Sequence, residues 1–409
     1  MHRTSSLLLP LLLTLSCADR SAVENAPRAA PGSGGAAGAT GGGASGSSAG
    51  GSSNGAFVHP GTLDGKAELD YVKARLAQRA EPYLGQLDRM KDVEQLELPP
   101  SPQTSVDANS ASADAARDDA RRAYGNALVW YLTDDVAYAE RAVAYLNAWS
   151  ELQAITAKDG QNRLVAGWLG SLFGPAADLM RGYSGWSVGD VEKMRAMFER
   201  AFYPLLNTAS TWNGNVDLHQ ISAMMAIAVF NEDRAELDLG LTRLSARIPA
   251  YFYLASDGEP PRIAGDNGNV AAFWGNPAKW VDGLTQESCR DNGHHAQFGL
   301  SGALGAMETA WHQGIDVYSS YQPRMIASLE LMGLQGSSGS MQGTCANDAT
   351  SADVYDTWEI GYNHFHVRKG IALPRTWTMI SSKVRAAQSN PGAWSIFYET
   401  LTHADITYP

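Results

Sequence analysis

The segment QESCRDNGHHAQFGL, residues 286–300, brings an acid, a thiol, an arginine and two adjacent histidines into one short run. If the segment is helical, Glu287, Arg290 and His294 share one face, because residues three and four apart are neighbours on a helix. That face offers a cation, an imidazole and an acid, the groups that proton-transfer chemistry on a charged substrate needs. The alternative interpretation is a surface ion pair between Glu287 and Arg290, which would contribute little.

A second dense segment is WEIGYNHFH, residues 358–366. Tyr362 and His366 share a face if it is helical, and Tyr362, His364 and His366 share one if it is extended. Either conformation places a phenol near an imidazole. His364 and His366 also have a spacing found in metal sites, but neither an HExxH motif nor a carboxylate-rich partner motif accompanies them. We therefore expect no metal and no cofactor.

A third candidate is WNGNVDLH, residues 212–219, where Asn215 and His219 would lie on one helix face just after a turn. Asn213 and Asn215 can also be explained as turn and helix-capping residues. A single histidine on a helix is more commonly structural than catalytic. The segment becomes informative only together with the other two.

Charge and cysteine content exclude several classes of function. The net charge of −12 argues against nucleic acid, although an anionic substrate remains compatible with positive charge focused in a cleft. No GxSxG motif is present, which disfavours a serine hydrolase. Cys289 and Cys345 could form a disulfide or remain two buried thiols, since their separation along the chain does not decide this.

The elements that must position these groups are helices. Residues 67–90 have apolar side chains at helical spacing, with a break or kink near Pro82. Similar periodicity occurs over 115–132, 136–152, 164–181, 188–202, 217–230, 237–248, 299–313 and 322–333. Strand signals are sparse. We predict a mainly α domain over 57–409, built of antiparallel helix pairs, as an α/α toroid rather than a solenoid because no strict repeat is present.

Two long irregular stretches interrupt the helices, residues 255–286 and 334–357. Each leads directly into one of the two dense segments, and long loops in a compact domain are commonly functional. Trp274 and Trp280 lie on the first loop and are candidates for stacking on sugar rings or, alternatively, for anchoring the loop.

The N-terminal residues predict export. A charged start, the apolar run 7–15 and Cys17 fit a signal peptide over residues 1–17, and the cysteine favours a lipoprotein over a plain secretory signal. Residues 18–56 are rich in Gly, Ser and Ala and predict a disordered linker. We expect a cell-surface or outer-membrane lipoprotein, otherwise a periplasmic or secreted protein, whose only membrane contact is a lipid anchor.

The chain resembles the alginate lyase domain family of polysaccharide lyases from residue 59 to about residue 374. The stretches that carry the resemblance, in the same order, are ELDYVKARLAQRAEPY, AYGNALVWYLTDDVAYAERAVAYLNAWS, GNVDLHQISAMMAIAVFNEDR, VDGLTQESCRDNGH, ETAWHQGIDVY and WEIGYNHFHVRKGIALP. The resemblance implies an α/α toroid and cleavage of uronate polysaccharides by β-elimination. In that reaction donors neutralise the uronate carboxylate, a base removes the adjacent carbon-bound proton, and an acid assists the leaving oxygen.

Carried onto this sequence, the resemblance gives Asn215 and Arg290 the neutralising role and makes His294 part of the same segment. Two departures follow. Val216 stands where the family has a histidine after the asparagine, and Phe298 ends the region where the family places its catalytic tyrosine. We therefore take Tyr362 as the candidate base, with His294 as a competing base.

The remaining candidates would bind substrate; they are His219, Glu287, His364, Trp212, Trp274 and Trp280. We expect a monomer acting on an acidic polysaccharide such as alginate. One alternative is a glycoside hydrolase, which would pair Asp282 or Glu287 with Asp353, Asp356 or Glu359 as its two carboxylates. The other is a surface lipoprotein that binds carbohydrate without cleaving it.

Overall fold

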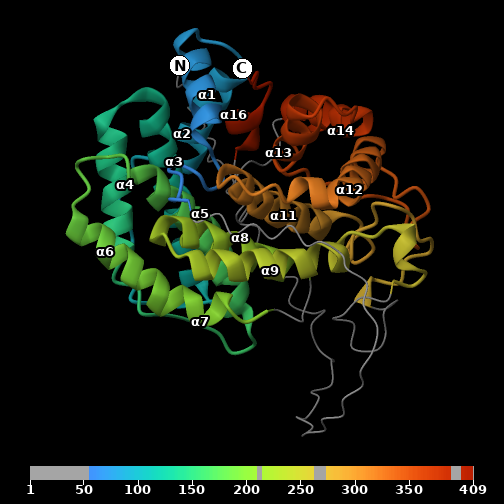
Figure 1. The fold of residues 1–409 in the computed structure, drawn as a ribbon, viewed down its shortest axis with the longest axis horizontal. Coiled ribbons are helices and arrows are strands. Elements are labelled where there is room, and N and C mark those ends of the chain that lie inside the picture. The colour runs from blue at the N-terminus through green and yellow to red at the C-terminus, as the bar shows by residue number, and fades with distance from the viewer. Residues whose placement is uncertain (1–54, 210–213, 262–272, 388–397, 409) are drawn as a thin grey trace, which may run out of the picture. The chain divides into compact units, whose positions relative to one another are not determined.

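The computed structural model describes residues 55–209, 214–261, 273–387 and 398–408. The predicted signal peptide, nearly all of the predicted linker and Trp212 lie outside these residues. Helices dominate the described part (Figure 1). They are α1 (Lys66–Ala77), α2 (Tyr83–Glu94), α3 (Ala111–Thr133), α4 (Val136–Trp149), α5 (Gln161–Met180), α6 (Val188–Met197), η1 (Phe198–Phe202), α7 (Tyr203–Leu206), α8 (Gly214–Asn231), α9 (Arg234–Tyr251), η2 (Ala255–Asp257), α11 (His294–His312), α12 (Tyr318–Ser338), α13 (Glu359–Tyr362), η3 (Asn363–Arg368), α14 (Pro374–Met379), η4 (Ile380–Val384), α15 (Arg385–Ala387) and α16 (Glu399–His403).

An inner layer is formed by helices α3, α5, α8 and α11, which pack in this order, and α13 adjoins α11. Within it α5, α8 and α11 run in the same direction. Along the contact of α5 with α8, Gly167 faces His219 and Gly174 faces Ala226, so the residue numbers rise together. Glycine is needed there because a Cβ on Gly174 would lie 3.0 Å from the Ala226 side chain. The N-termini of the inner helices therefore gather at one end of the layer.

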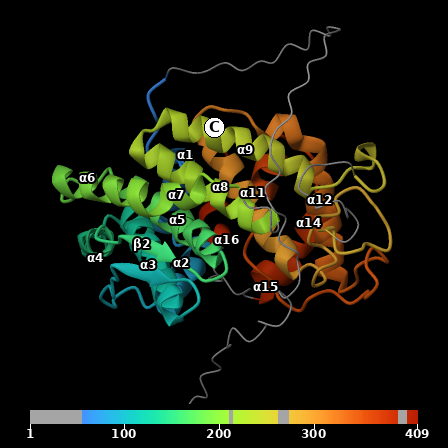
Figure 2. The same cartoon turned by 90° about the horizontal axis from the view of Figure 1, so that it is seen from below.

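The outer helices return the chain between successive inner helices. Helix α4 packs against α3 and α5, and α9 packs against α8 and α11 (Figures 1 and 2). Helix α16 packs against α1, α2 and α13, which brings the last described helix beside the first. This arrangement of helix pairs confirms the predicted α/α toroid.

Most predicted helices are present, with two differences. Residues 67–90 form the separate helices α1 and α2, because the chain breaks before Pro82, which stands at the N-cap of α2. Residues 286–293 form turns, and α11 begins only at His294. The prediction that Glu287, Arg290 and His294 share one face of a helix is therefore wrong, because Glu287 and Arg290 lie in turns. Gly293 explains the late start, since it precedes the helix with a φ of +93°.

The described strands are a small addition to the helices. β1 (Ser105–Asp107) and β2 (Ala154–Thr156) pair in parallel, with Val106 opposite Ile155. Both residues are buried and join the core of the first helix pairs. Among the described residues, no helix is both long and apolar enough to cross a membrane.

Candidate functional site

The turn of residues 286–293 and the second long loop meet at the N-terminal end of the inner helices and are joined covalently. Cys289 and Cys345 form a disulfide, which resolves the alternative that the sequence left open. Beside it, the Asn292 side chain donates to the Ala349 carbonyl at 2.7 Å, and the Ser351 amide donates to the Asn292 carbonyl at 2.9 Å. The turn that carries Arg290 is thus fixed to the loop of residues 339–358.

Glu287 is the polar centre of this end of the molecule. Its carboxylate is 1% exposed and accepts from the Asn215 backbone amide at 3.1 Å and from Asn215 Nδ2 at 2.8 and 2.9 Å. Arg290 Nη1 donates to the same carboxylate at 2.7 Å. The structure therefore brings Asn215, Glu287 and Arg290 together. Of the three, Arg290 is the exposed member, with 42% of its side chain accessible.

Tyr251, which the sequence analysis did not single out, completes this group. It is the last residue of α9, fully buried, and its hydroxyl donates to Glu287 Oε2 at 3.0 Å. A Cβ added to Gly214 or Gly299 would lie 2.0 or 2.1 Å from the Tyr251 side chain, so these two glycines make room for it. The only signal in the sequence was its position, shortly before the first long loop.

Glu287 cannot contact substrate in this arrangement, contrary to its predicted binding role. The carboxylate is buried, and both of its oxygens accept hydrogen bonds from protein donors. A buried carboxylate in such surroundings holds its donors in place, because losing any of them would leave charge uncompensated. Its contribution to the site is made through Asn215 and Arg290.

His294 begins α11 and faces the second loop. Its Nδ1 is hydrogen-bonded to Asp353 Oδ2 at 2.7 Å and lies 3.5 Å from the Tyr355 hydroxyl. The rings of His294, Phe298 and Tyr355 pack together. Asp353 therefore fixes the orientation of the imidazole and leaves Nε2 as the other ring nitrogen. Phe298 packs next to His294, and the phenol near His294 is that of Tyr355, in the loop of residues 339–358.

Tyr362 lies in different surroundings from Asn215, Arg290 and His294. Its ring stacks on Trp377 at a centroid distance of 5.4 Å and packs against His366 at 4.7 Å. Burial and the nearby charge of Glu359 raise its pKa. A tyrosine with a raised pKa is a weaker candidate for a base, since ionising it costs more.

His219 and His364 are buried rather than presented at a surface. Burial lowers the pKa of each histidine to about 4, so both are neutral near pH 7. His219 lies inside the inner layer on α8, and His364 stacks on Tyr318 with a centroid distance of 3.6 Å. These surroundings fit structural roles better than the predicted contact with substrate.

The loop tryptophans differ in exposure. Trp274 is 2% exposed and packs against Tyr253 and Trp280. Its rings therefore have no free face for a sugar, and the anchoring interpretation fits better. Trp280 is partly exposed at the edge of the same cluster, so it is compatible both with stacking on a sugar ring and with anchoring the loop.

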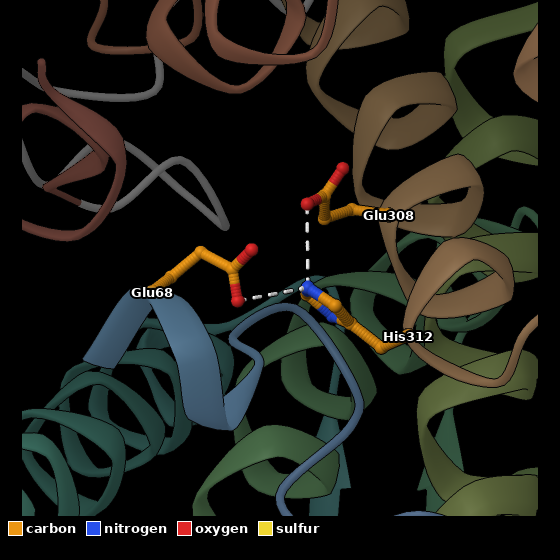
Figure 3. Close-up of side chains that lie close together, drawn as sticks. All are labelled: Glu68, Glu308 and His312. Carbon is orange, nitrogen blue, oxygen red and sulfur yellow. Dashed lines mark ion pairs between the residues drawn. The ribbon is translucent and has the colours of Figure 1, made fainter. Parts of the chain in front are cut away.

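At the opposite end of the inner helices, Glu68, Glu308 and His312 point toward one another and have residue types that bind metals (Figure 3). His312 Nε2 is 3.3 Å from Glu308 and 3.5 Å from Glu68. Arg368 Nη2 is 2.5 Å from Glu308 and 2.8 Å from Glu68. Burial alone would lower the pKa of His312, but the two carboxylates raise it to about 10. Two carboxylates are thus balanced by two cations, and we interpret the cluster as an ion-pair network joining α1, α11 and η3.

The carboxylates proposed for a hydrolase are engaged elsewhere. Glu359 is buried and paired with Arg385 at 2.6 Å, and Asp356 is buried and accepts from Thr400. Asp282 accepts from the Ala255 amide at 2.6 Å. Asp353 is exposed, but its partner is His294 rather than a second carboxylate. These contacts do not provide the two opposed carboxylates that glycoside hydrolysis needs.

Comparison with known proteins points to one family. Residues 67–262 match the family model described as alginate lyase. This range includes Asn215 but ends before Arg290. No curated protein matches the chain in sequence.

Solved structures share the fold. Alginate lyase A1-III from Sphingomonas species A1 is 15% identical, with a TM-score of 0.53 over 77% of this chain and 90% of that one. A variant of alginate lyase A1-III complexed with a tetrasaccharide is 16% identical, with a TM-score of 0.53 over 77% and 89%. An alginate lyase from Bacteroides ovatus is 13% identical, with a TM-score of 0.56 over 84% and 99%. At these identities the likeness establishes the fold.

Proposed function

Since residues 67–262 belong to the alginate lyase family and the chain is a polysaccharide lyase, we propose that it cleaves a uronate-containing polysaccharide by β-elimination at the site of Asn215, Arg290 and His294. The observation that carries the proposal is the group formed by Asn215, Glu287 and Arg290, placed where the two long loops meet. Alginate is the first candidate substrate, because the family and its solved relatives are alginate lyases.

The site suits an anionic substrate despite the net charge of −12. Helix α11 begins at His294, and a helix N-terminus carries a partial positive charge. Arg290 adds a full charge on an exposed side chain. A uronate carboxylate placed against Arg290 would be neutralised, which makes the adjacent carbon-bound proton easier to remove.

His294 is the base that the geometry favours. Hydrogen bonding of Nδ1 to Asp353 leaves Nε2 to accept a proton, and the positive imidazole that forms would be stabilised by the carboxylate. Tyr355 lies beside it, but burial and the charges of Asp353 and Asp291 raise its pKa above the ordinary value. A phenol of that kind stays protonated and is a donor rather than a base.

The proposed cellular location rests on the N-terminal residues alone. The signal-like segment 1–17 and the Gly/Ser/Ala-rich residues 18–56 support an exported lipoprotein whose lyase domain is held away from the membrane by a tether. Radiolabelled fatty acid incorporated by the wild-type chain but not by a Cys17→Ser variant would test the anchor.

The activity is tested by incubating the full chain with alginate, polyglucuronate and hyaluronan, together with a neutral polysaccharide as the control. Elimination creates a carbon–carbon double bond, so ultraviolet absorbance should rise with at least one of the acidic polymers. Arg290→Ala should lower the rate by about 100- to 1000-fold, the usual cost of losing one charge-stabilising donor. New reducing ends without absorbance would indicate hydrolysis, and binding without either signal would indicate a carbohydrate-binding protein; both results would contradict the proposal.

A further inference from the structure

The buried carboxylate of Glu287 joins three elements that are far apart in the sequence. It accepts from Asn215 at the start of α8, from Tyr251 at the end of α9, and from Arg290 in the turn before α11. Its neighbour Gln286 accepts from the Gly214 amide at 2.8 Å. Residues 286 and 287 therefore take the capping role at the N-terminus of α8, where backbone amides lack partners within the helix.

The helix end explains how a carboxylate is tolerated in this buried position. Burying a lone carboxylate costs several kcal/mol or more, but the α8 terminus and Arg290 both supply compensating positive charge. Each oxygen also accepts more than one hydrogen bond. The geometry of the Glu287 side chain is thus fixed from three sides.

This geometry fixes the buried amide of Asn215 and the exposed guanidinium of Arg290, which would meet the substrate carboxylate. Asn215 Nδ2 lies 2.8 and 2.9 Å from the two oxygens of Glu287, so the orientation of the amide is determined by the carboxylate. Arg290 Nη1 donates to Glu287 at 2.7 Å and Nε lies 4.0 Å from Asp291 Oδ2, while much of the side chain remains accessible. The hydrogen bond to Glu287 orients the guanidinium and leaves its other N–H groups able to bind a substrate.

Tyr251 makes the arrangement rigid. Its ring is enclosed between Gly214 and Gly299, each of which lacks the Cβ that would collide with it. The hydroxyl therefore has little freedom to leave Glu287, and the ring wedges α8 against α11. A group of side chains held by such packing keeps its geometry when a substrate binds.

We infer that Glu287 is the positioning residue of the elimination site: it orients the Arg290 guanidinium toward the substrate carboxylate, while the buried Asn215 amide and Tyr251 hold Glu287 in turn. The inference rests on the proposed function and deepens it. Glu287 does not touch the substrate, so its removal should lower kcat much more than it raises KM.

The first experiment compares Glu287→Gln with Glu151→Gln, which changes an exposed carboxylate. Glu287→Gln should lower kcat by about 100-fold with KM within about threefold of wild type, because misoriented donors mainly weaken transition-state binding. Tyr251→Phe should lower kcat by about three- to tenfold, the scale of one hydrogen bond, and serves if Glu287→Gln folds poorly. Wild-type kcat in both variants would overturn the inference.

A second experiment separates positioning from general stability. Arg290→Ala should regain part of its activity with millimolar guanidinium, which Glu287 would hold in the vacated place. Adding Glu287→Gln to Arg290→Ala should abolish that gain. A purely structural Glu287 would lower the activities with and without guanidinium alike, so an unchanged ratio would overturn the inference.

A third measurement does not depend on turnover. A crystal structure of Glu287→Gln should show the Arg290 guanidinium displaced relative to wild type, and an unchanged position would overturn the positioning role. If the wild-type chain makes no unsaturated product while the guanidinium moves as expected, the proposed function fails and the positioning role stands.

Discussion

The Cys289–Cys345 disulfide offers the prediction whose size can be worked from the structure most directly. The bond closes a loop with a sequence separation of 56 residues. Closing such a loop removes about 14 cal/mol/K from the entropy of the unfolded chain, which corresponds to about 4 kcal/mol at 25 °C. Replacing both cysteines by serine should therefore lower the free energy of unfolding by about 4 kcal/mol, or somewhat less if residual structure already constrains the unfolded chain.

The same replacement should also reduce activity. The bond fixes the turn of Arg290 to the loop that supplies Asp353, and Asp353 orients His294. Hydrogen bonds from Asn292 and Ser351 keep the loops in contact without the bond, so we expect a decrease in kcat of about tenfold rather than its loss.

Urea unfolding followed by tryptophan fluorescence and the absorbance assay measure the two effects on the same protein. Cys17→Ser is the matched control, since it removes a cysteine and leaves the Cys289–Cys345 pair intact. An unfolding free energy within 1 kcal/mol of wild type together with unchanged kcat would refute the view that the disulfide holds the two loops in register.

Three further predictions follow from individual contacts. His294→Ala should lower kcat by about 100-fold or more, whereas Tyr362→Phe should stay within about threefold of wild type. If initial rates show the large loss in Tyr362→Phe and not in His294→Ala, Tyr362 is the base. Burial and the charge of Glu359 raise the pKa of Asp356 to about 7, so folding stability should fall as pH rises from about 4 to about 7. The melting temperature of Asp356→Asn should fall less than that of wild type across this range. An equal fall in both proteins would contradict the prediction. Arg368→Ala should cost about 3–5 kcal/mol in urea unfolding because it removes one of the two cations that Glu68 and Glu308 share, and a cost below 1 kcal/mol would show that the ion-pair network is dispensable.

The fold was predictable because helical periodicity is a local property of the sequence. Apolar spacing predicted the helices that the structure shows as α3, α5, α8 and α11. The start of α11 was predicted less well. Residues 286–293 carry polar groups at helical spacing, but Gly293 and the disulfide at Cys289 favour turns, and a tertiary bond is not visible in local periodicity.

The site was predictable in part. Asn215 and Arg290 were identified by residue type and by the family resemblance, and the structure places them around one carboxylate. The roles of Tyr251 and Asp353 depend on contacts between segments that are far apart in the sequence, which single-sequence spacing cannot supply. For the same reason Glu287 was predicted to bind substrate, although three-dimensional packing makes it an internal anchor.

The most direct test of the central claim is the mass of the products from a defined uronate oligosaccharide. Elimination breaks the glycosidic bond without adding water, so the masses of the two products should sum to the mass of the substrate. Hydrolysis adds one water across the bond, so a sum larger by the mass of one water would contradict a lyase mechanism at Arg290 and His294.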